Sequence, residues 1–169
     1  EISTRDWSSD VCSSDLITWD EGQPDDAGKF KKFPKGKDGT GDKWQMQHQW
    51  TTFDEAIAEA RRLNRAGVGI VLPAQLSDGN FLVALDFDDV DIGEQENNPR
   101  YDEILQTFDD LHQPYAEESP SLKGLRMFLR SSNPIAQISR LNKHGGKDEL
   151  FCASSRWVTV TGMRVGGSG

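Results

Sequence analysis

The sequence predicts an α+β domain, in which helices pack on a β-sheet that contains hairpins. Residues 52–63 and 101–111 carry apolar residues at helical spacing. Short apolar runs around them, bounded by Gly, Pro, Asn and Asp, are typical of strands. Because helices and strands are mixed along the chain and hairpins are expected, the pattern favours a mixed or antiparallel sheet with helices on it.

Length, charge and composition bound the class of protein. A chain of 169 residues is long enough for one domain with a real core. Its formal charge of −9 and pI near 4.8 argue against a protein that coats nucleic acid through bulk positive charge, but they leave room for a local basic groove. Since it has no apolar run of membrane-spanning length and no signal sequence, we expect a soluble, cytoplasmic protein. Its two cysteines and three histidines show neither a disulfide framework nor zinc spacing.

Residues 1–16 are expected to be non-native and disordered. Residues 6–16 are polar and serine-rich, without a helical or strand period. They also back-translate to a sequence that resembles a sequencing adapter, so we exclude them as one excludes a cloning scar. The first sixteen residues hold four acids and Arg5, a net −3, so that −6 of the total −9 is left for the remainder. The domain proper is then expected over residues 17–162, with residues 163–169 as a linker or a truncated end.

Residues 17–49 are rich in Gly, Lys, Asp and Pro, which predicts an extended, loop-rich segment held by scattered aromatic residues. Two interpretations stay open for its lysines, a solvated loop and an arm that contacts phosphate. These lysines are Lys29, Lys31, Lys32, Lys35 and Lys37.

A helix followed by two strands is expected next. Thr52 and Glu55 form a capping-box pattern, in which each side chain satisfies an open backbone donor at the helix start. Apolar residues then recur at helical spacing to Leu63. Residues 68–72 and 81–86 are apolar strands separated by a turn-rich connection, so we expect the two to pair as a hairpin.

The second half of the chain holds one more helix and several short strands. Asn98 and Pro99 fit a helix cap followed by proline in the first turn, and residues 101–111 are amphipathic. Residues 131–146 lack a firm period and are expected to form a short helix or a loop. Four further strands are expected, of which the last two pair as a hairpin: residues 114–118, 125–129, 149–152 and 157–160.

Two acids follow the apolar run at residues 81–85. Asp86 and Asp88 lie two apart, and in a strand such side chains point to the same face. Two carboxylates that close repel each other unless a cation lies between them, and a divalent ion held by oxygen ligands is the usual cation. An acidic strand end is more often a solvated turn, so the pair by itself leaves both interpretations open.

A polar loop at residues 119–124 adds groups that suit a triphosphate. Hydroxyls, backbone N–H groups near a glycine and two cations within one turn are typical of phosphate sites. The same composition also occurs in an ordinary serine–proline turn with surface cations. The groups concerned are Ser119, Ser121, Lys123 and Arg126.

Two charged residues near the last strands have open roles. Glu149 opens a run of apolar residues, and it is either a third metal ligand or an edge residue. Arg156 precedes the final strand, where it would contact a phosphate or form a salt bridge with Glu149.

The order of these motifs resembles the primase-polymerase domain of phage, plasmid and mobile-element replication proteins, within the archaeo-eukaryotic primase superfamily. The likeness spans about residues 30–162 and includes the lysine–proline segment and the tryptophan before the first helix. The motifs are Gly67-Val68-Gly69-Ile70-Val71-Leu72, Leu85-Asp86-Phe87-Asp88, the run from Glu118 to Arg126, Glu149-Leu150-Phe151 and the run from Arg156 to Gly162.

The family carries an acid-x-acid pair, a serine-x-histidine motif and a later acid. Asp86 and Asp88 match the pair, Glu149 matches the later acid, and the serine loop matches the second motif in position. This chain has Arg126 where histidine is usual and Leu122 where glycine is frequent. Arginine can contact phosphates bidentately but cannot exchange a proton as histidine does, so nucleotide binding is expected and turnover is open.

The resemblance implies a catalytic core like an RNA-recognition motif and nucleotidyl transfer by two metal ions, Mg²⁺ or Mn²⁺. The three acids would be the catalytic residues and the metal ligands. The expected partners are nucleoside triphosphates, a single-stranded DNA template and a helicase domain or subunit, with no membrane. The residues that would bind the nucleotide are Ser119, Ser121, Lys123, Arg126 and Arg156.

Three hypotheses for the function follow. The first is a metal-dependent primase-polymerase domain. The second is a catalytically silent module that binds nucleotides or nucleic acid, for which Arg126 is the best argument. The third is an unrelated hydrolase or a metal-stabilised structural domain. The decisive observation is whether Asp86, Asp88 and Glu149 converge in one cleft with Arg126 within reach of a phosphate. A Glu149 on the opposite face would exclude the metal site.

Overall fold

The chain has a mixed α+β fold, and every strand pairing among the residues that the structure describes is antiparallel. A computed structural model describes residues 2–3, 15–26, 28–72, 75–76, 78–90, 98–153 and 156–165. The chain divides into two compact units, where the sequence suggested one domain. The α3 unit, named after helix α3 (Pro99–Asp110), comprises Glu1–Val11, Pro73–Ser154 and Thr161–Gly169. The α2 unit, named after helix α2 (Phe53–Arg62), comprises Cys12–Leu72 and Ser155–Val160.

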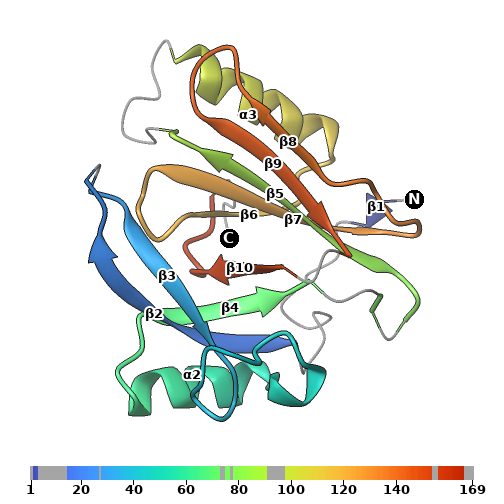
Figure 1. The fold of residues 1–169 in the computed structure, drawn as a ribbon. Helices are drawn as coiled ribbons and strands as arrows, with labels where there is room; N and C mark the ends of the chain where they lie inside the picture. The colour runs from blue at the N-terminus through green and yellow to red at the C-terminus, as the bar shows by residue number, and fades with distance from the viewer. Residues whose placement is uncertain are drawn as a thin grey trace. The chain divides into compact units, whose positions relative to one another are not determined.

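The α3 unit is built on a six-stranded antiparallel sheet. Its central strand β5 lies between β7 and β9, and β8 forms one edge beside β9 (Figure 1). On the other side, β6 pairs with one end of β7 and the short β1 with its other end. The strands are β1 (Ile2–Ser3), β5 (Phe81–Asp88), β6 (Tyr115–Glu118), β7 (Gly124–Ser131), β8 (Ile138–Leu141) and β9 (Lys147–Cys152).

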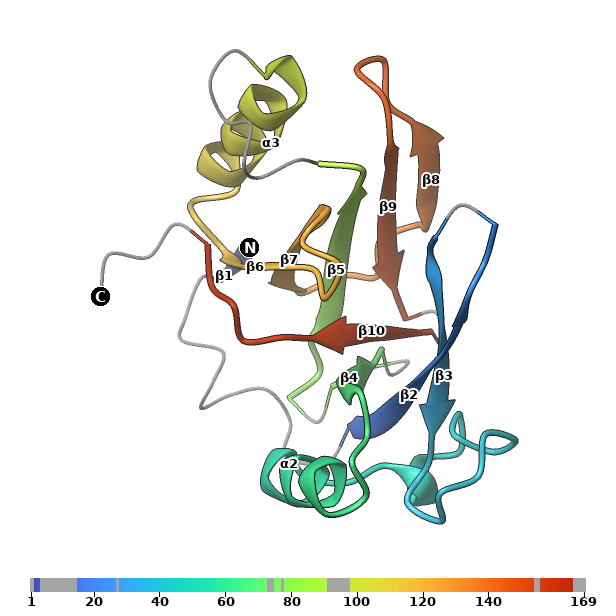
Figure 2. The same cartoon turned by 90° about the vertical axis from the view of Figure 1, so that its left-hand side faces the viewer.

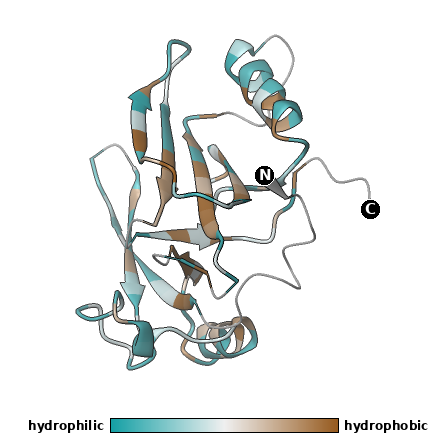
Figure 3. Cartoon of the chain, turned by 90° about the vertical axis from the view of Figure 1, so that its right-hand side faces the viewer, coloured by the Kyte–Doolittle hydropathy of each residue, from teal (hydrophilic) through white to brown (hydrophobic). Residues whose placement is uncertain are grey.

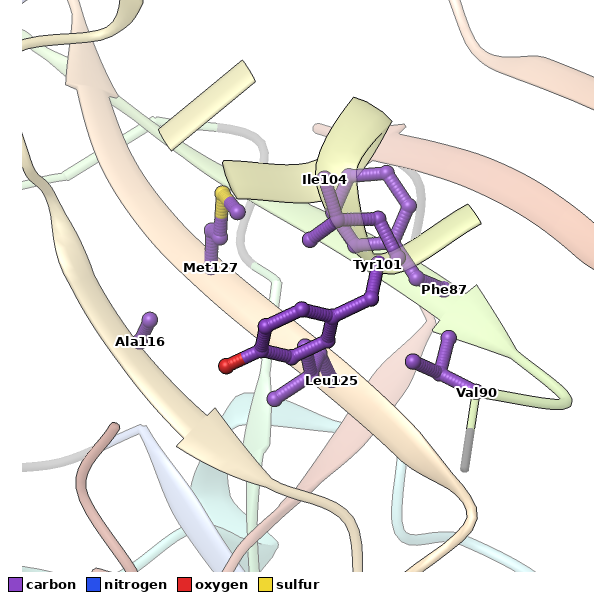
Figure 4. Packing of buried hydrophobic residues seen from close by; sticks show 7 residues of the cluster. All are labelled: Phe87, Val90, Tyr101, Ile104, Ala116, Leu125 and Met127. Carbon is purple, nitrogen blue, oxygen red and sulfur yellow. The ribbon is translucent and has the colours of Figure 1, made fainter. Parts of the chain in front are cut away.

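Helix α3 packs on one face of this sheet (Figure 2). The helix starts where the sequence predicts, because the Asn98 side chain accepts hydrogen bonds from the backbone N–H groups of Arg100 and Tyr101. Tyr101 and Ile104 point from the helix into a buried cluster (Figure 4). Their partners from the sheet and its edge are Phe87, Val90, Ala116, Leu125 and Met127.

The α2 unit holds a four-stranded antiparallel sheet in the order β10, β4, β2, β3. The capping box predicted for α2 is confirmed: the Thr52 hydroxyl accepts from the Glu55 N–H, and the Glu55 carboxylate accepts from the Thr52 N–H. Hydrogen bonds from Thr51 and Thr52 lower the pKa of Glu55 to about 2. The elements are β2 (Leu16–Pro24), β3 (Phe30–Lys35), the short 3₁₀ helix η1 (Gln47–Gln49), α2, β4 (Gly67–Val71) and β10 (Trp157–Val160).

Both helices carry a mixture of hydrophobic and hydrophilic residues (Figure 3). In the α2 unit, Ala56 is fully buried against Leu16 and Val68. Burial of one side of each helix explains why the apolar spacing predicted both of them. No helix in the described part of the chain is long and apolar enough to cross a lipid bilayer.

The strand partners differ from the expected hairpins. Residues 68–72 and 81–86 were expected to pair with each other, but β4 pairs with β2 and β10, whereas β5 pairs with β7 and β9. The hairpin expected from β9 and β10 is wrong for the same reason, since the two belong to different sheets. An apolar run indicates a buried strand but carries no information about its partner.

Two segments for which no strand was predicted, one expected to be extended and loop-rich and the other a short helix or loop, contain strands. Residues 17–49 include the β2–β3 hairpin, and residues 131–146 include β8. Both β3 and β8 are edge strands in the described sheets and neither has a buried residue, so neither shows the apolar pattern that marks a strand.

Both ends of the expected domain also need correction. Asp15 and Leu16 were placed in the disordered start, but both are buried, and Leu16 pairs with Ile70 as β2 begins. At the other end, the backbone of Arg164 forms an isolated antiparallel β-bridge with that of Glu117, and Val165 packs on the cluster around α3. The structure also places Ile2–Ser3 in β1. The rest of the suspected adapter segment, residues 4–14, and residues 166–169 lie outside the described residues.

Candidate functional site

Five polar residues line up across the sheet of the α3 unit, one on each of five neighbouring strands. Residues directly opposite on paired strands point to the same face, so the register places all five on one face. We call this set the polar row. In strand order β6, β7, β5, β9, β8 it consists of Glu117, Arg126, Asp86, Glu149 and Ser139.

The polar row includes three of the residues that the sequence singled out. Asp86 is the register partner of Arg126 on β7 and of Glu149 on β9. Asp88 lies two residues further along β5, so it points to the same face as Asp86. The three predicted acids therefore share one face of one sheet, next to Arg126, and this face is opposite the one that packs on α3.

Arg126 is the cation of the polar row. Its side chain is only 6% exposed, and its Nε donates a hydrogen bond to Asp86 Oδ1 over 3.0 Å. Charge-assisted hydrogen bonds of this kind are stronger than neutral ones. They are stronger still in a buried site, because the local dielectric constant is lower than in water. A phosphate bound by Arg126 would share the guanidinium with Asp86, so its role in nucleotide binding stays a prediction.

Glu117 flanks Arg126 on the other side and has no solvent exposure. Its carboxylate accepts hydrogen bonds from the backbone N–H groups of Thr161 and Gly162 over 3.0 and 3.1 Å, and from the Tyr115 hydroxyl over 3.1 Å. Burial raises the pKa of Glu117, although these donors and the charge of Arg126 act in the opposite direction. Glu117 thus holds the segment after residue 160 to the edge of the sheet.

Glu149 is also paired with a cation. Lys147 Nζ lies 2.7 Å from Glu149 Oε1, and the Ser139 hydroxyl donates to the same oxygen over 3.2 Å. Lys147 lies two residues before Glu149 on β9 and so points to the same face. Two carboxylates that are register partners thus each have their own cation, Arg126 for Asp86 and Lys147 for Glu149.

The polar loop predicted at residues 119–124 is a tight turn that joins β6 to β7. Ser119 is buried, its hydroxyl lies 3.0 Å from that of Ser121, and its N–H donates to the Gly124 carbonyl. Gly124 is the register partner of Asp88, and a Cβ at Gly124 would lie 2.9 Å from the Phe87 carbonyl oxygen. The turn with Ser119, Ser121 and Lys123 therefore lies beside the acidic end of β5.

Leu122 occupies the one left-handed position of this turn, with a φ of +58°. Glycine adopts such a conformation without the steric cost that a side chain brings. The resemblance implies glycine at position 122, and the backbone conformation at this position also favours glycine.

A buried ion pair ties α3 to the sheet on the opposite face. Arg100 donates to Asp148 Oδ1 over 2.9 Å and to the backbone carbonyl of Asp88 over 2.7 Å. Burial alone would raise the pKa of Asp148, but hydrogen bonds from Asn142 and Arg100 and the charges of Arg100 and Arg140 outweigh it and lower the pKa. Arg100 therefore holds the backbone at Asp88 in place from the face of the sheet on which α3 packs.

Arg156 belongs to the α2 unit, where it lies just before β10 with an exposed side chain. Its carbonyl oxygen accepts from the Leu72 N–H over 2.8 Å. The structure places the lysines Lys31, Lys32 and Lys35 of the same unit on β3.

The acids on the polar face suit Mg²⁺ or Mn²⁺ in donor chemistry, since carboxylate oxygens are the ligands that these ions prefer. Within the described residues, however, no three His, Cys, Asp or Glu side chains gather closely enough to hold a metal ion. The predicted ligands Asp86 and Glu149 are instead paired with Arg126 and Lys147. The metal role of the three acids stays a prediction.

Sequence reasoning missed Glu117 and Arg100. A signal for Glu117 existed: once Ser119 and Gly124 are taken to close the turn between two strands, the hairpin register places Glu117 opposite Arg126. No local pattern marks Arg100, because its partners Asp88 and Asp148 are 12 and 48 residues away.

No protein-family model matches the chain, and no curated protein matches it.

Proposed function

We propose that this chain is a primase-polymerase domain that performs template-directed nucleotidyl transfer, as in replication proteins of phages, plasmids and mobile elements. The observation that carries the proposal is the polar row, in which Asp86 and Glu149 are register partners on one face of the sheet. Asp88 and the serine turn lie at the same end of β5. An antiparallel sheet with α3 on one face and acids on the other is also consistent with a core like an RNA-recognition motif.

Asp86, Asp88 and Glu149 would hold Mg²⁺ or Mn²⁺, which makes a primer 3′-hydroxyl a better nucleophile and stabilises the triphosphate and the leaving pyrophosphate when bound. Ion pairs orient both carboxylates: Arg126 orients that of Asp86, and Lys147 orients that of Glu149.

The serine turn would bind the triphosphate of the incoming nucleotide. Ser119 and Ser121 contribute hydroxyl donors, and Lys123 contributes an exposed cation next to them. Arg156 belongs to the α2 unit, and its contact with a phosphate stays a prediction from the sequence. Single-stranded DNA is the proposed template, and a helicase domain or subunit is the proposed partner.

Primer synthesis and extension on single-stranded DNA test the proposal. The wild-type chain is expected to incorporate labelled nucleotides with Mg²⁺ or Mn²⁺, and Asp86→Asn is expected to lose roughly 100-fold or more of this activity. Asn keeps the shape of the side chain, and circular dichroism would verify the fold. Asp110→Asn, an exposed acid at the end of α3, is the matched control and is expected to retain activity. Absence of product from a folded wild-type chain with either metal would refute the proposal.

One observation favours a second candidate, a catalytically silent module that binds nucleotides or nucleic acid. The carboxylates of Asp86 and Glu149 are already neutralised by Arg126 and Lys147, so the face needs no metal ion to relieve their repulsion. Under this alternative the wild-type chain binds a nucleoside triphosphate but forms no product. Binding that persists in Asp86→Asn, together with no product from wild type, would favour the silent module.

A further inference from the structure

Strand β3 presents an aromatic side chain between two lysines on one face of the sheet in the α2 unit. Phe33 is 48% exposed, and Lys31 and Lys35 lie two residues to either side of it. Side chains two apart on a strand point to the same face and are about 6.6 Å apart along it. We call Lys31, Phe33 and Lys35 the β3 stripe. It lies on an edge strand of the sheet of its unit.

The aromatic ring of the stripe rests on a glycine. A Cβ at Gly22, on the neighbouring strand β2, would lie 2.4 Å from a ring carbon of Phe33. Only a residue without a side chain lets the ring pack this closely against the backbone of β2. The ring is therefore supported on one side while about half of the side chain remains open to solvent.

The charge of β3 is opposite to that of the whole chain. The strand has three lysines and no acid, a formal +3, in a protein of net charge −9. Among the described residues, neither Lys31 nor Lys35 has an ion pair. The acid opposite Phe33 on this face, Asp20, is paired with Arg65, so the two lysines remain available to a ligand with regularly spaced negative charges.

Protection of a sheet edge explains only part of this composition. Lysines and proline on edge strands prevent edge-to-edge association, and β3 has both kinds of residue. Edge protection does not explain an exposed aromatic ring, which promotes association, nor the glycine that supports it. Alternating cations and an exposed ring are the features with which proteins bind single-stranded nucleic acid.

We propose that the β3 stripe binds single-stranded DNA, with a base stacked on Phe33 and the flanking phosphates on Lys31 and Lys35. Stacking on an aromatic ring tolerates any base, and the lysines contact the backbone, so the binding would not depend on sequence. The inference rests on the proposed function only in the choice of single-stranded DNA as the occupant.

Fluorescence anisotropy of a labelled oligothymidylate with the full chain tests the stripe. Phe33→Leu, which keeps apolar bulk over Gly22 but removes the ring, is expected to weaken binding about 5- to 150-fold, whereas Phe33→Trp retains it. The double variant Lys31→Gln/Lys35→Gln is expected to reduce the slope of log K against log salt by about 1.4, or about 0.7 for each phosphate contact, between about 50 mM and about 200 mM salt.

Phe53→Ala and Lys143→Gln are the matched controls, because Phe53 is 52% exposed on α2 and Lys143 is exposed in the turn after β8. Both are expected to bind as the wild type does. The inference would be overturned if the stripe variants had the affinity and the salt slope of the wild type. It would also be overturned if the lysine variants aggregated while their binding was unchanged, because the lysines would then serve only to protect the edge of the sheet.

The stripe and the proposed function fail in different experiments. Asp86→Asn is expected to bind the oligonucleotide normally while it loses primer synthesis. If the wild type makes no product but the stripe variants lose binding, the stripe stands and the polymerase proposal falls. If the wild type makes product and the stripe variants bind the oligonucleotide as tightly as the wild type, only the inference about the β3 stripe is overturned.

Discussion

Leu122→Gly is expected to stabilise the protein, although it removes a large apolar side chain. Leu122 has a φ of +58°, where a non-glycine residue costs about 1–2 kcal/mol. Glycine avoids this cost but loses more entropy on folding, about 0.5–1 kcal/mol. The side chain is 54% exposed, so the burial lost with it offsets only part of this gain. The two backbone contributions differ by about 0–1.5 kcal/mol in favour of glycine, so the net gain should be at most about 1.5 kcal/mol, or at most about 6 °C in Tm for a chain of this size.

Thermal and urea denaturation of three variants test this reasoning. Leu122→Ala removes the side chain but keeps the left-handed strain, so its Tm should be at or below that of wild type. Leu105→Gly replaces a leucine that is 40% exposed inside α3, and it should cost about 1 kcal/mol through helix propensity and further through lost burial. If Leu122→Gly lowers Tm as Leu105→Gly does, the backbone of the serine turn does not favour glycine and the reasoning fails.

The other predictions concern buried charges. Arg100→Met should cost about 3–5 kcal/mol in urea denaturation, because it leaves Asp148 buried without its partner at 2.9 Å. Arg140→Met, which removes a 65% exposed partner of the same carboxylate, should cost less than about 1 kcal/mol, and equal losses from the two variants would contradict this account. The lowered pKa of Asp148 predicts stability that is present above its ordinary value of 3.8 and lost as pH falls through the lowered pKa, and Asp148→Asn should lack this loss. Glu117 has the opposite sign: burial raises its pKa above 4.5, so the free energy of unfolding should fall as pH rises from 4.5 through the raised pKa, and an unchanged pH profile in Glu117→Gln would refute this.

The candidate site could be predicted in part. The alternation along a strand is enough to place Asp86 and Asp88 on one face, and β5 includes both. That Glu149 and Arg126 join them follows from the register of three strands, which no local pattern specifies. The ion pair of Arg126 with Asp86 also appeared only in the structure, because from the sequence Arg126 was assigned to phosphate.

The sequence by itself determined the elements whose signals lie within a few residues. The Thr52–Glu55 capping box and the Asn98 cap each involve groups two or three residues apart, and both helices begin where these caps predict. Tertiary structure alone decided which strands pair, that the chain forms two compact units, and that Glu117 and Arg100 are buried with charged partners. The physical reason is that caps and periodicity depend on neighbours in the chain, whereas strand partners depend on how apolar surface from distant segments is buried together.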